Sequence, residues 1–253
     1  MKTRIAVLAS GDGTNLQAIL DHFRTLGDAA CGEVVIVLSN RAGAGALDRA
    51  RAAGVDAIVF DPRSEDDLAR ILTGRDIQLV VLAGYLRLVP PSVIARFRNR
   101  IVNVHPGPLP RFGGAGMYGA RVHEAVLAAG LIETAVTVHL VTEQYDEGLP
   151  LAMWPVPVLD NDTQRPLRRA CCVSSTLCSP ESLTRSLQLL CRTAALAELR
   201  HISCLSHYYQ YRTRPALWNS PVDSRISDGI SCRQAALPRH YALRGSRFAM
   251  LAT

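Results

Sequence analysis

The chain has 253 residues, and its 28 Lys and Arg exceed its 22 Asp and Glu, which gives a formal net charge of +6. It is 48% hydrophobic and 20% charged. These values argue against collagen-like and fully disordered proteins, and no apolar run approaches the roughly 20 residues that a membrane span needs.

Five short apolar runs predict strands that are buried on both faces, at residues 4–9, 34–38, 57–60, 79–83 and 101–104. The segments between them carry helical spacing or helix start signals. We expect helices from residue 16, over residues 46–53, from Ser64 to Leu72 and from Pro90 onward. Ser64 and Asp67 resemble a capping box with Asp in place of Glu.

Further along, residues 117–129 predict another helix. Residues 134–142 alternate with period two, which predicts a strand with one polar face, and residues 151–158 could pair with it as an antiparallel edge. Strands that alternate with helices imply right-handed crossovers. The predicted fold is therefore α/β: a Rossmann-like open, mostly parallel sheet with helices on both faces and an antiparallel C-terminal edge.

The loop at residues 10–15 lies between a predicted strand and a predicted helix. Gly11 and Gly13 allow a tight turn and a close approach of the backbone to a ligand. A helix N-terminus with Thr14 and Asn15 beside it suits a phosphate group. The loop matches neither the dinucleotide-binding nor the Walker spacing, so an ordinary glycine turn is the alternative.

A second candidate lies where the fifth strand ends. Asn103 and His105 are two residues apart, so both side chains leave the same face of that strand. Asn can donate an amide N–H to an oxyanion, and His can move a proton near neutrality. His139 and Asp146 follow on and after the alternating strand, and Asp146 is a candidate partner for His105. Structural roles for these residues are the alternative.

Four segments together resemble the phosphoribosylglycinamide formyltransferase family, a group of folate-dependent enzymes of purine synthesis. They lie in unbroken order at residues 9–19 (ASGDGTNLQAI), 82–89 (LAGYLRLV), 103–114 (NVHPGPLPRFGG) and 137–148 (TVHLVTEQYDEG). Each motif is weak alone, but four in this order are specific. The resemblance covers about residues 3–162.

The resemblance implies a role for each matching residue. The phosphate of glycinamide ribonucleotide would bind at Gly13, Thr14 and Asn15. The co-substrate 10-formyltetrahydrofolate would contact Arg63, Leu86, Arg87, Leu88, Val89, Asn103, Thr142, Glu143, Gln144, Tyr145 and Asp146. The residues implied to be catalytic are Asn103, His105 and Asp146.

The implied reaction is attack of the substrate amine on the formyl carbon. Asn103 and protonated His105 would stabilise the oxyanion, by about 3–4 kcal/mol per well-placed donor. Asp146 would keep His105 protonated, and His105 would also transfer protons. No metal is required. The alternatives are a 10-formyltetrahydrofolate deformylase and an inactive folate- or nucleotide-binding protein; methionyl-tRNA formyltransferase fits the phosphate-type loop less well.

The last 91 residues differ from the rest. Residues 1–162 hold 15 basic and 18 acidic residues, a net charge of −3, whereas residues 163–253 hold 13 and 4, a net charge of +9. Six of the seven cysteines also lie there. The family resemblance implies a long helix after Thr163 whose Glu contacts the substrate, but residues 164–172 read QRPLRRACC. We therefore predict a formyltransferase domain at 1–162 and an anomalous, poorly ordered tail at 163–253.

One hypothesis for this tail is a reading frame lost near residue 164, because Arg, Ser, Cys and Leu are enriched in it. A basic RNA-binding appendage with stacking tyrosines and a divergent domain are the alternatives. For the rest of the chain, nucleic acid is disfavoured as a partner, since the first 162 residues are mildly acidic. Gly11 ends the first apolar run too early for a secretory signal, so we expect a reducing cytoplasm.

Overall fold

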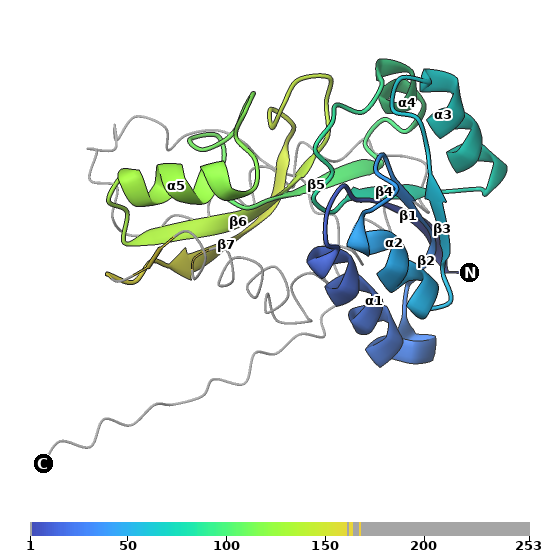
Figure 1. Ribbon diagram of the computed structural model, residues 1–253, viewed down its shortest axis with the longest axis horizontal. Coiled ribbons are helices and arrows are strands. Elements are labelled where there is room, and N and C mark those ends of the chain that lie inside the picture. Colours follow the sequence, from blue (N-terminus) through green and yellow to red (C-terminus); the bar gives the residue numbers. More distant parts are fainter. Residues whose placement is uncertain (1, 161, 164–166, 168–253) are drawn as a thin grey trace, which may run out of the picture. The chain divides into compact units, whose positions relative to one another are not determined.

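The computed structural model describes residues 2–160, 162, 163 and 167, and all structural statements below concern these residues (Figure 1). Nearly all of the predicted tail at 163–253 lies outside them.

The described residues form one seven-stranded sheet in the order β3-β2-β1-β4-β5-β6-β7. The β1–β2, β2–β3, β1–β4 and β4–β5 pairs are parallel. The β5–β6 and β6–β7 pairs are antiparallel. The predicted α/β fold with an antiparallel C-terminal edge is therefore confirmed. The strands are β1 (Thr3–Leu8), β2 (Gly32–Ser39), β3 (Asp56–Val59), β4 (Leu79–Leu82), β5 (Ile101–His105), β6 (Glu133–Leu140) and β7 (Pro150–Pro157).

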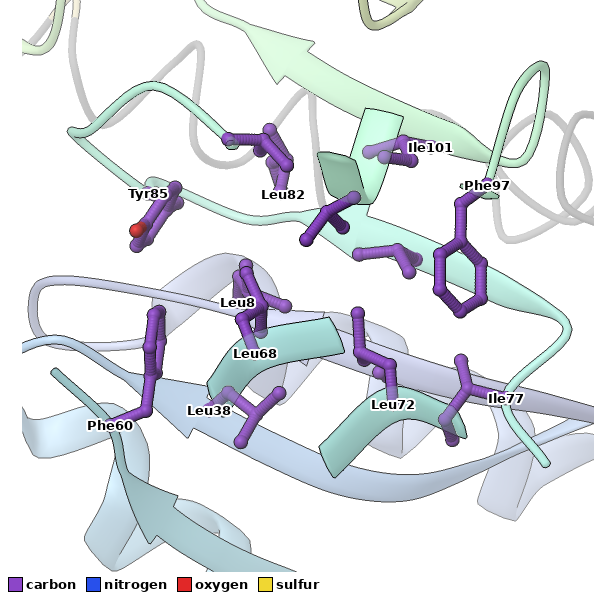
Figure 2. Packing of buried hydrophobic residues seen from close by; sticks show 14 of the residues in the cluster. Leu8, Leu38, Phe60, Leu68, Leu72, Ile77, Leu82, Tyr85, Phe97 and Ile101 are labelled. Atoms are coloured by element: carbon purple, nitrogen blue, oxygen red, sulfur yellow. The ribbon is translucent and has the colours of Figure 1, made fainter. Parts of the chain in front are cut away.

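Helices cover both faces of the sheet, so the apolar side chains of β1 are buried on both faces. Ile5 and Val7 belong to the cluster under α1 and α2, whereas Ala6 and Leu8 belong to the cluster under α3 and α4. Figure 2 shows Leu8 packed near Leu68 and Leu72 of α3. Burying each such Leu or Ile is worth about 2–3 kcal/mol. The helices are α1 (Thr14–Leu26), α2 (Gly45–Ala52), α3 (Glu65–Gly74), α4 (Pro91–Arg96) and α5 (Ala120–Ala128), with a short 3-10 turn η1 (Gly27–Ala29) after α1.

Three sequence predictions need correction. The polar face of β6 that carries Thr137 and His139 does not lie in solvent, because both residues are at most 2% exposed. Ser64 occupies the N-cap position of α3, but its side chain makes no capping hydrogen bond. The helix predicted from residue 117 begins at Ala120, after a loop with a positive φ at Gly119.

The carboxyl ends of the parallel strands lie at one edge of the sheet, where open α/β folds place their ligands. The loops after β1, β4 and β5 all emerge there. This edge, together with the turn after β6, is where the sequence predicts a site.

Candidate active site

The loop after β1 is shaped by a close approach to α2. Gly13 has φ +75, and a Cβ there would lie 2.6 Å from the Cα of Ala46, so a side chain does not fit. The backbone N–H of Ala46 donates to the Gly11 carbonyl (3.1 Å), and Arg49 Nε donates to the Asp12 carbonyl (2.7 Å). These two hydrogen bonds hold the loop against α2.

The same loop leads directly into α1, which has Gly13 at its N-cap and no side-chain capping hydrogen bond. A helix N-terminus of this kind carries N–H groups without intrahelical partners and a positive dipole end. Thr14 and Asn15 line the cavity beside it. The arrangement suits an anionic group such as a phosphate.

At the opposite end of the cavity, β5, β6 and the following turn bring together four polar side chains. His105 Nδ1 lies 3.5 Å from Asp146 Oδ2, and His139 Nε2 lies 3.4 Å from Asp146 Oδ1. Asn103 Nδ2 lies 3.0 Å from His139 Nε2 and 3.5 Å from Asp146 Oδ1. The expectation that Asp146 reaches His105 therefore agrees with the geometry.

The Asp146 carboxylate is held in place by the backbone around it. Its Oδ2 accepts a hydrogen bond from the Gly114 N–H (3.1 Å), and its own φ is +56, in the left-handed region. A non-glycine residue in that region has a strained backbone, which surrounding contacts must hold in place. Such residues are found often at functional sites. At Gly148, two residues on, a Cβ would lie 1.6 Å from the Leu140 carbonyl oxygen, so the turn requires glycine there.

The ionisation of His105 reflects two opposed effects. Burial lowers its pKa below the ordinary value, and the Asp146 charge and the Phe112 carbonyl, which lies 2.8 Å from Nε2, raise it by less. Asp146 thus acts in the expected direction, but burial has the larger effect in the protein alone. That Asp146 keeps His105 protonated stays a prediction.

The pKa of Asp146 is lowered. Burial alone would raise it, but the hydrogen bond with His139, the electrostatic interaction with His105 and the hydrogen bond from the Gly114 amide together outweigh burial. The carboxylate is therefore ionised at neutral pH. An ionised Asp146 beside a neutral His105 is prepared to stabilise that imidazole when it gains a proton.

The wall between these two ends is the loop after β4, residues 84–89. Its apolar side chains Leu86 and Leu88 are 44% and 48% exposed, and Tyr145 across the cavity is 43% exposed. Tyr85 and Val89 are buried and anchor the loop in the core. Burial raises the pKa of Tyr85 to about 12, with a smaller opposing effect of Arg87. Exposed apolar side chains around a cavity mouth suit a flat aromatic ligand.

One cavity of about 330 Å³ joins the loop after β1, the loop after β4 and the polar cluster. It is lined by nearly all the residues predicted to form the site: Gly13, Thr14, Asn15, Leu86, Arg87, Leu88, Val89, Asn103, His105, Thr142, Gln144, Tyr145 and Asp146. Glu143 is exposed and does not line it. Arg63 lines a neighbouring cavity that also includes Arg87, and it is paired with Asp61.

Comparison with known proteins shows the family to which the chain belongs. Residues 3–173 match the formyl transferase family. The chain belongs to that family. The match extends 11 residues past the boundary that the sequence suggested. Leu167 is fully buried against the cluster around α5, and its N–H donates to the Thr163 carbonyl. The predicted division at residue 162 remains a prediction.

The relatives of this formyl transferase include phosphoribosylglycinamide formyltransferases. The chloroplastic protein of that name from Arabidopsis thaliana is 37% identical over 176 residues, which cover 66% of this chain and 60% of the relative. The chain thus spans well under two thirds of that curated relative. Glycinamide ribonucleotide transformylase 1 from Symbiobacterium toebii is 41% identical, with a TM-score of 0.66, over 72% of this chain and 86% of that one.

These relatives confirm the resemblance that the four sequence segments suggested. A formyltetrahydrofolate deformylase from Pseudomonas syringae pv. tomato str. DC3000 has the same TM-score of 0.66 at 20% identity, which shows a shared fold alone. In the described part of this formyl transferase, no helix has the length and apolarity to cross a membrane. The described residues also contain no group of three or more His, Cys, Asp or Glu that could hold a metal ion.

The site also contains residues that the sequence did not predict. His139 is one of them, and β6 pairs it directly with Asn103. The alternating pattern of residues 134–142 predicted a strand. If this strand lies antiparallel to β5, one of its polar residues can lie opposite Asn103. Tyr118 and His123 also line the cavity, from the loop before α5 and from α5 itself. No local motif indicated them.

Proposed function

We propose that this protein transfers a formyl group from 10-formyltetrahydrofolate to the amine of glycinamide ribonucleotide, a step of purine biosynthesis. The observation that carries the proposal is the buried cluster of Asn103, His105, His139 and Asp146, in the same cavity as the loop after β1. A formyl transfer needs an oxyanion donor and a proton carrier next to an anchored amine, and this cavity supplies both. The names of the relatives support the choice of substrates.

In this proposal the substrate phosphate binds at Gly13, Thr14 and Asn15. The carbonyls of Gly11 and Asp12 are already engaged by α2, so the backbone presents donors to an anion. This subsite anchors the amine substrate, and the rest of the molecule then extends along the cavity towards His105. Anchoring by a remote group provides the proximity that a two-substrate reaction needs.

The folate lies against residues Leu86, Arg87, Leu88 and Val89, with Thr142, Glu143, Gln144, Tyr145 and Asp146 on the other side. Leu86, Leu88 and Tyr145 offer apolar surface to its ring system, and the loop backbone offers polar groups to the ring edge. Arg63 and Arg87 line the neighbouring cavity, where their charge suits the acidic tail of the folate. The formyl group then faces Asn103 and His105.

The reaction follows from the state of these groups. The amine nitrogen bonds to the formyl carbon, and the carbonyl electron pair moves onto oxygen, where an Asn103 N–H stabilises it. Neutral His105 takes a proton from the attacking nitrogen, and ionised Asp146 stabilises the resulting imidazolium. The imidazolium then protonates N10 of the folate as the bond from that nitrogen to carbon breaks. The products are the formylated amide and tetrahydrofolate, and no metal takes part.

One assay tests the proposal. Purified protein is mixed with 10-formyltetrahydrofolate, with and without glycinamide ribonucleotide, and formation of tetrahydrofolate is followed. We expect tetrahydrofolate only when the amine is present. Loss of the formyl group without the amine would instead indicate a hydrolase, and folate binding without turnover would indicate an inactive binding protein.

We also propose that the protein works in the cytoplasm, in line with its single described cysteine, Cys31, being a free thiol. The Arabidopsis relative is named as chloroplastic, so an organelle is the competing location. Fractionation of the source cells with detection of the native protein distinguishes the two.

A further inference from the structure

Ser10 lies at the point where three loops of the site meet. It lies two residues after the end of β1, whose neighbours in the sheet are β2 on one side and β4 on the other. Its exposure is 1%, and it lines the cavity beside the loop that the proposed function assigns to the phosphate. A serine that is this well buried needs partners for its hydroxyl group.

The contacts of Ser10 reach both neighbouring loops. Its Oγ donates to Asn40 Oδ1 (2.7 Å), in the loop after β2, and accepts from the Leu86 N–H (3.1 Å), in the loop after β4. Its backbone N–H donates to the Gly84 carbonyl (3.0 Å). A hydroxyl has one proton to donate, and here it goes to Asn40, which leaves the lone pairs to accept from Leu86. The two hydrogen bonds therefore run in one direction, from the Leu86 N–H to Ser10 Oγ and from the Ser10 hydroxyl to Asn40 Oδ1.

This linkage acts on the loop that the proposed function assigns to the folate. Leu86 and Leu88 are nearly half exposed, so burial of their side chains does little to fix the backbone between the anchors Tyr85 and Val89. The Ser10 hydroxyl holds that backbone at Leu86. Because Ser10 also precedes Gly11, the same residue joins the folate loop to the phosphate loop.

We propose that Ser10 is a positioning residue, which through Leu86 and Asn40 holds the folate loop in register with the phosphate loop. The inference rests on the proposed function, because it concerns the affinity for 10-formyltetrahydrofolate. It also makes a claim about the protein alone, since the Leu86 amide should depend on Ser10 for its protection from exchange.

The main test is Ser10→Ala, which leaves the Leu86 N–H and Asn40 Oδ1 without their partner. We expect the Kd and KM for 10-formyltetrahydrofolate to rise about tenfold, and kcat to change less. Calorimetry gives the Kd, steady-state kinetics gives KM and kcat, and hydrogen exchange followed by NMR reports the Leu86 amide. That amide should lose protection before any folate is added.

The matched control is Ser39→Ala. Ser39 is also fully buried at the end of a neighbouring strand, but its hydroxyl accepts from the Arg41 N–H and does not contact the folate loop. We expect a comparable loss of stability with the folate Kd of the parent. An equal rise in Kd for this variant would mean that any buried hydroxyl here matters, and it would overturn the proposal.

Changes at Asn40 keep the test decisive if Ser10→Ala does not fold. Asn40→Ala removes the acceptor of the Ser10 hydroxyl, so it should raise the folate Kd and lower the protection of the Leu86 amide. Where Ser10→Ala folds, a double-mutant cycle adds a further check: Ser10→Ala and Asn40→Ala should raise the Kd by less together than the product of their separate effects. Independent effects would contradict a shared hydrogen bond.

Failure of this inference differs from failure of the proposed function. If formyl transfer is absent but the folate Kd and the Leu86 amide both respond to Ser10, the transfer assignment fails and the positioning role stands. If the folate Kd and the Leu86 amide are unchanged in Ser10→Ala, the positioning role is wrong, whatever the transfer assay shows.

Discussion

At one end of the cavity the ligand would meet backbone, and at the other it would meet buried ionisable side chains. The loop after β1 offers N–H groups fixed by a glycine with φ +75 and by contacts with α2. The ends of β5 and β6 instead offer His105, His139 and Asp146, with side chains at most 10% exposed. The two ends share a cavity but depend on different properties of the chain.

The difference follows from what each end has to do. Holding a phosphate requires fixed donors, and backbone N–H groups provide them at any pH with no cost of burying a charge. Moving a proton requires a group whose ionisation can change, which burial and a close carboxylate provide at the cost of desolvation. Substitutions at the first end should therefore change binding, and substitutions at the second should change turnover.

The largest expected effect comes from His105→Asn. The variant removes the proton carrier but keeps a polar side chain of smaller volume, so transfer should fall about a thousandfold or more, with folate binding retained. Stopped-flow or steady-state assays give the rate, and calorimetry gives the folate Kd. His22→Asn is the control, since His22 is also buried but lies in α1, away from the cavity lining. Full activity of His105→Asn would remove His105 from the mechanism.

Gly13→Ala tests the backbone end. A Cβ at Gly13 adds the cost of a positive φ to a 2.6 Å contact with Ala46, so the loop must shift. We expect KM for glycinamide ribonucleotide to rise roughly ten- to hundredfold, equivalent to about 1–3 kcal/mol, with the folate Kd unchanged. Gly54→Ala is the matched control, because Gly54 has φ +73 and no neighbour within 4 Å of its Cβ position. If the folate Kd rose as much as the KM, the two ends would not be separable.

The two ends also differed in how far the sequence could predict them. The two glycines after β1 were compatible with a phosphate loop or with an ordinary turn, and phosphate binding there stays a prediction. Asn103 and His105 were expected on one face because strand side chains alternate. The polar alternation of β6 was misleading, because the pattern does not say what covers the second face. In the structure that face is buried, and His139 lies opposite Asn103.

Long-range contacts explain most of what the sequence could not show. A Cβ at Gly107, for example, would lie 2.6 Å from Val122 Cγ1 and 3.3 Å from His105 Nε2. Likewise, nothing in the residues around Ser10 indicates that its hydroxyl reaches loops 30 and 76 residues away. Such contacts depend on the packing of the sheet and helices, which no local pattern encodes.

The charged end should also make the stability depend on pH. The pKa of His105 is lowered in the folded protein, so below the ordinary value of 6.5 the unfolded chain binds more protons and stability falls. We expect the free energy of unfolding to decrease between pH 7 and pH 5, and to decrease less in His105→Asn. Urea unfolding at several pH values measures this. Gly13→Ala should keep the slope of the parent, since it leaves the ionisable cluster intact. Equal slopes for the parent and His105→Asn would contradict the buried, neutral His105.

The smallest effect on folate binding is expected for a substitution of Arg63, because the charge of its guanidinium group is exposed to solvent. The Arg63 guanidinium donates to the Asp61 carboxylate, among others from Nε to Oδ1 (3.0 Å) and from Nη2 to Oδ2 (2.9 Å), and its side chain is 90% exposed. An exposed charge is screened by solvent and salt, so Arg63→Ala should weaken folate binding by less than about fivefold. The salt dependence of the folate Kd should become shallower in the variant, because one cation facing the acidic tail is lost. Calorimetry at low and high salt checks both expectations. A rise in the folate Kd of a hundredfold or more at either salt concentration would contradict this expectation. It would mean that the exposed Arg63 contributes as much to the site as the buried charged residues do.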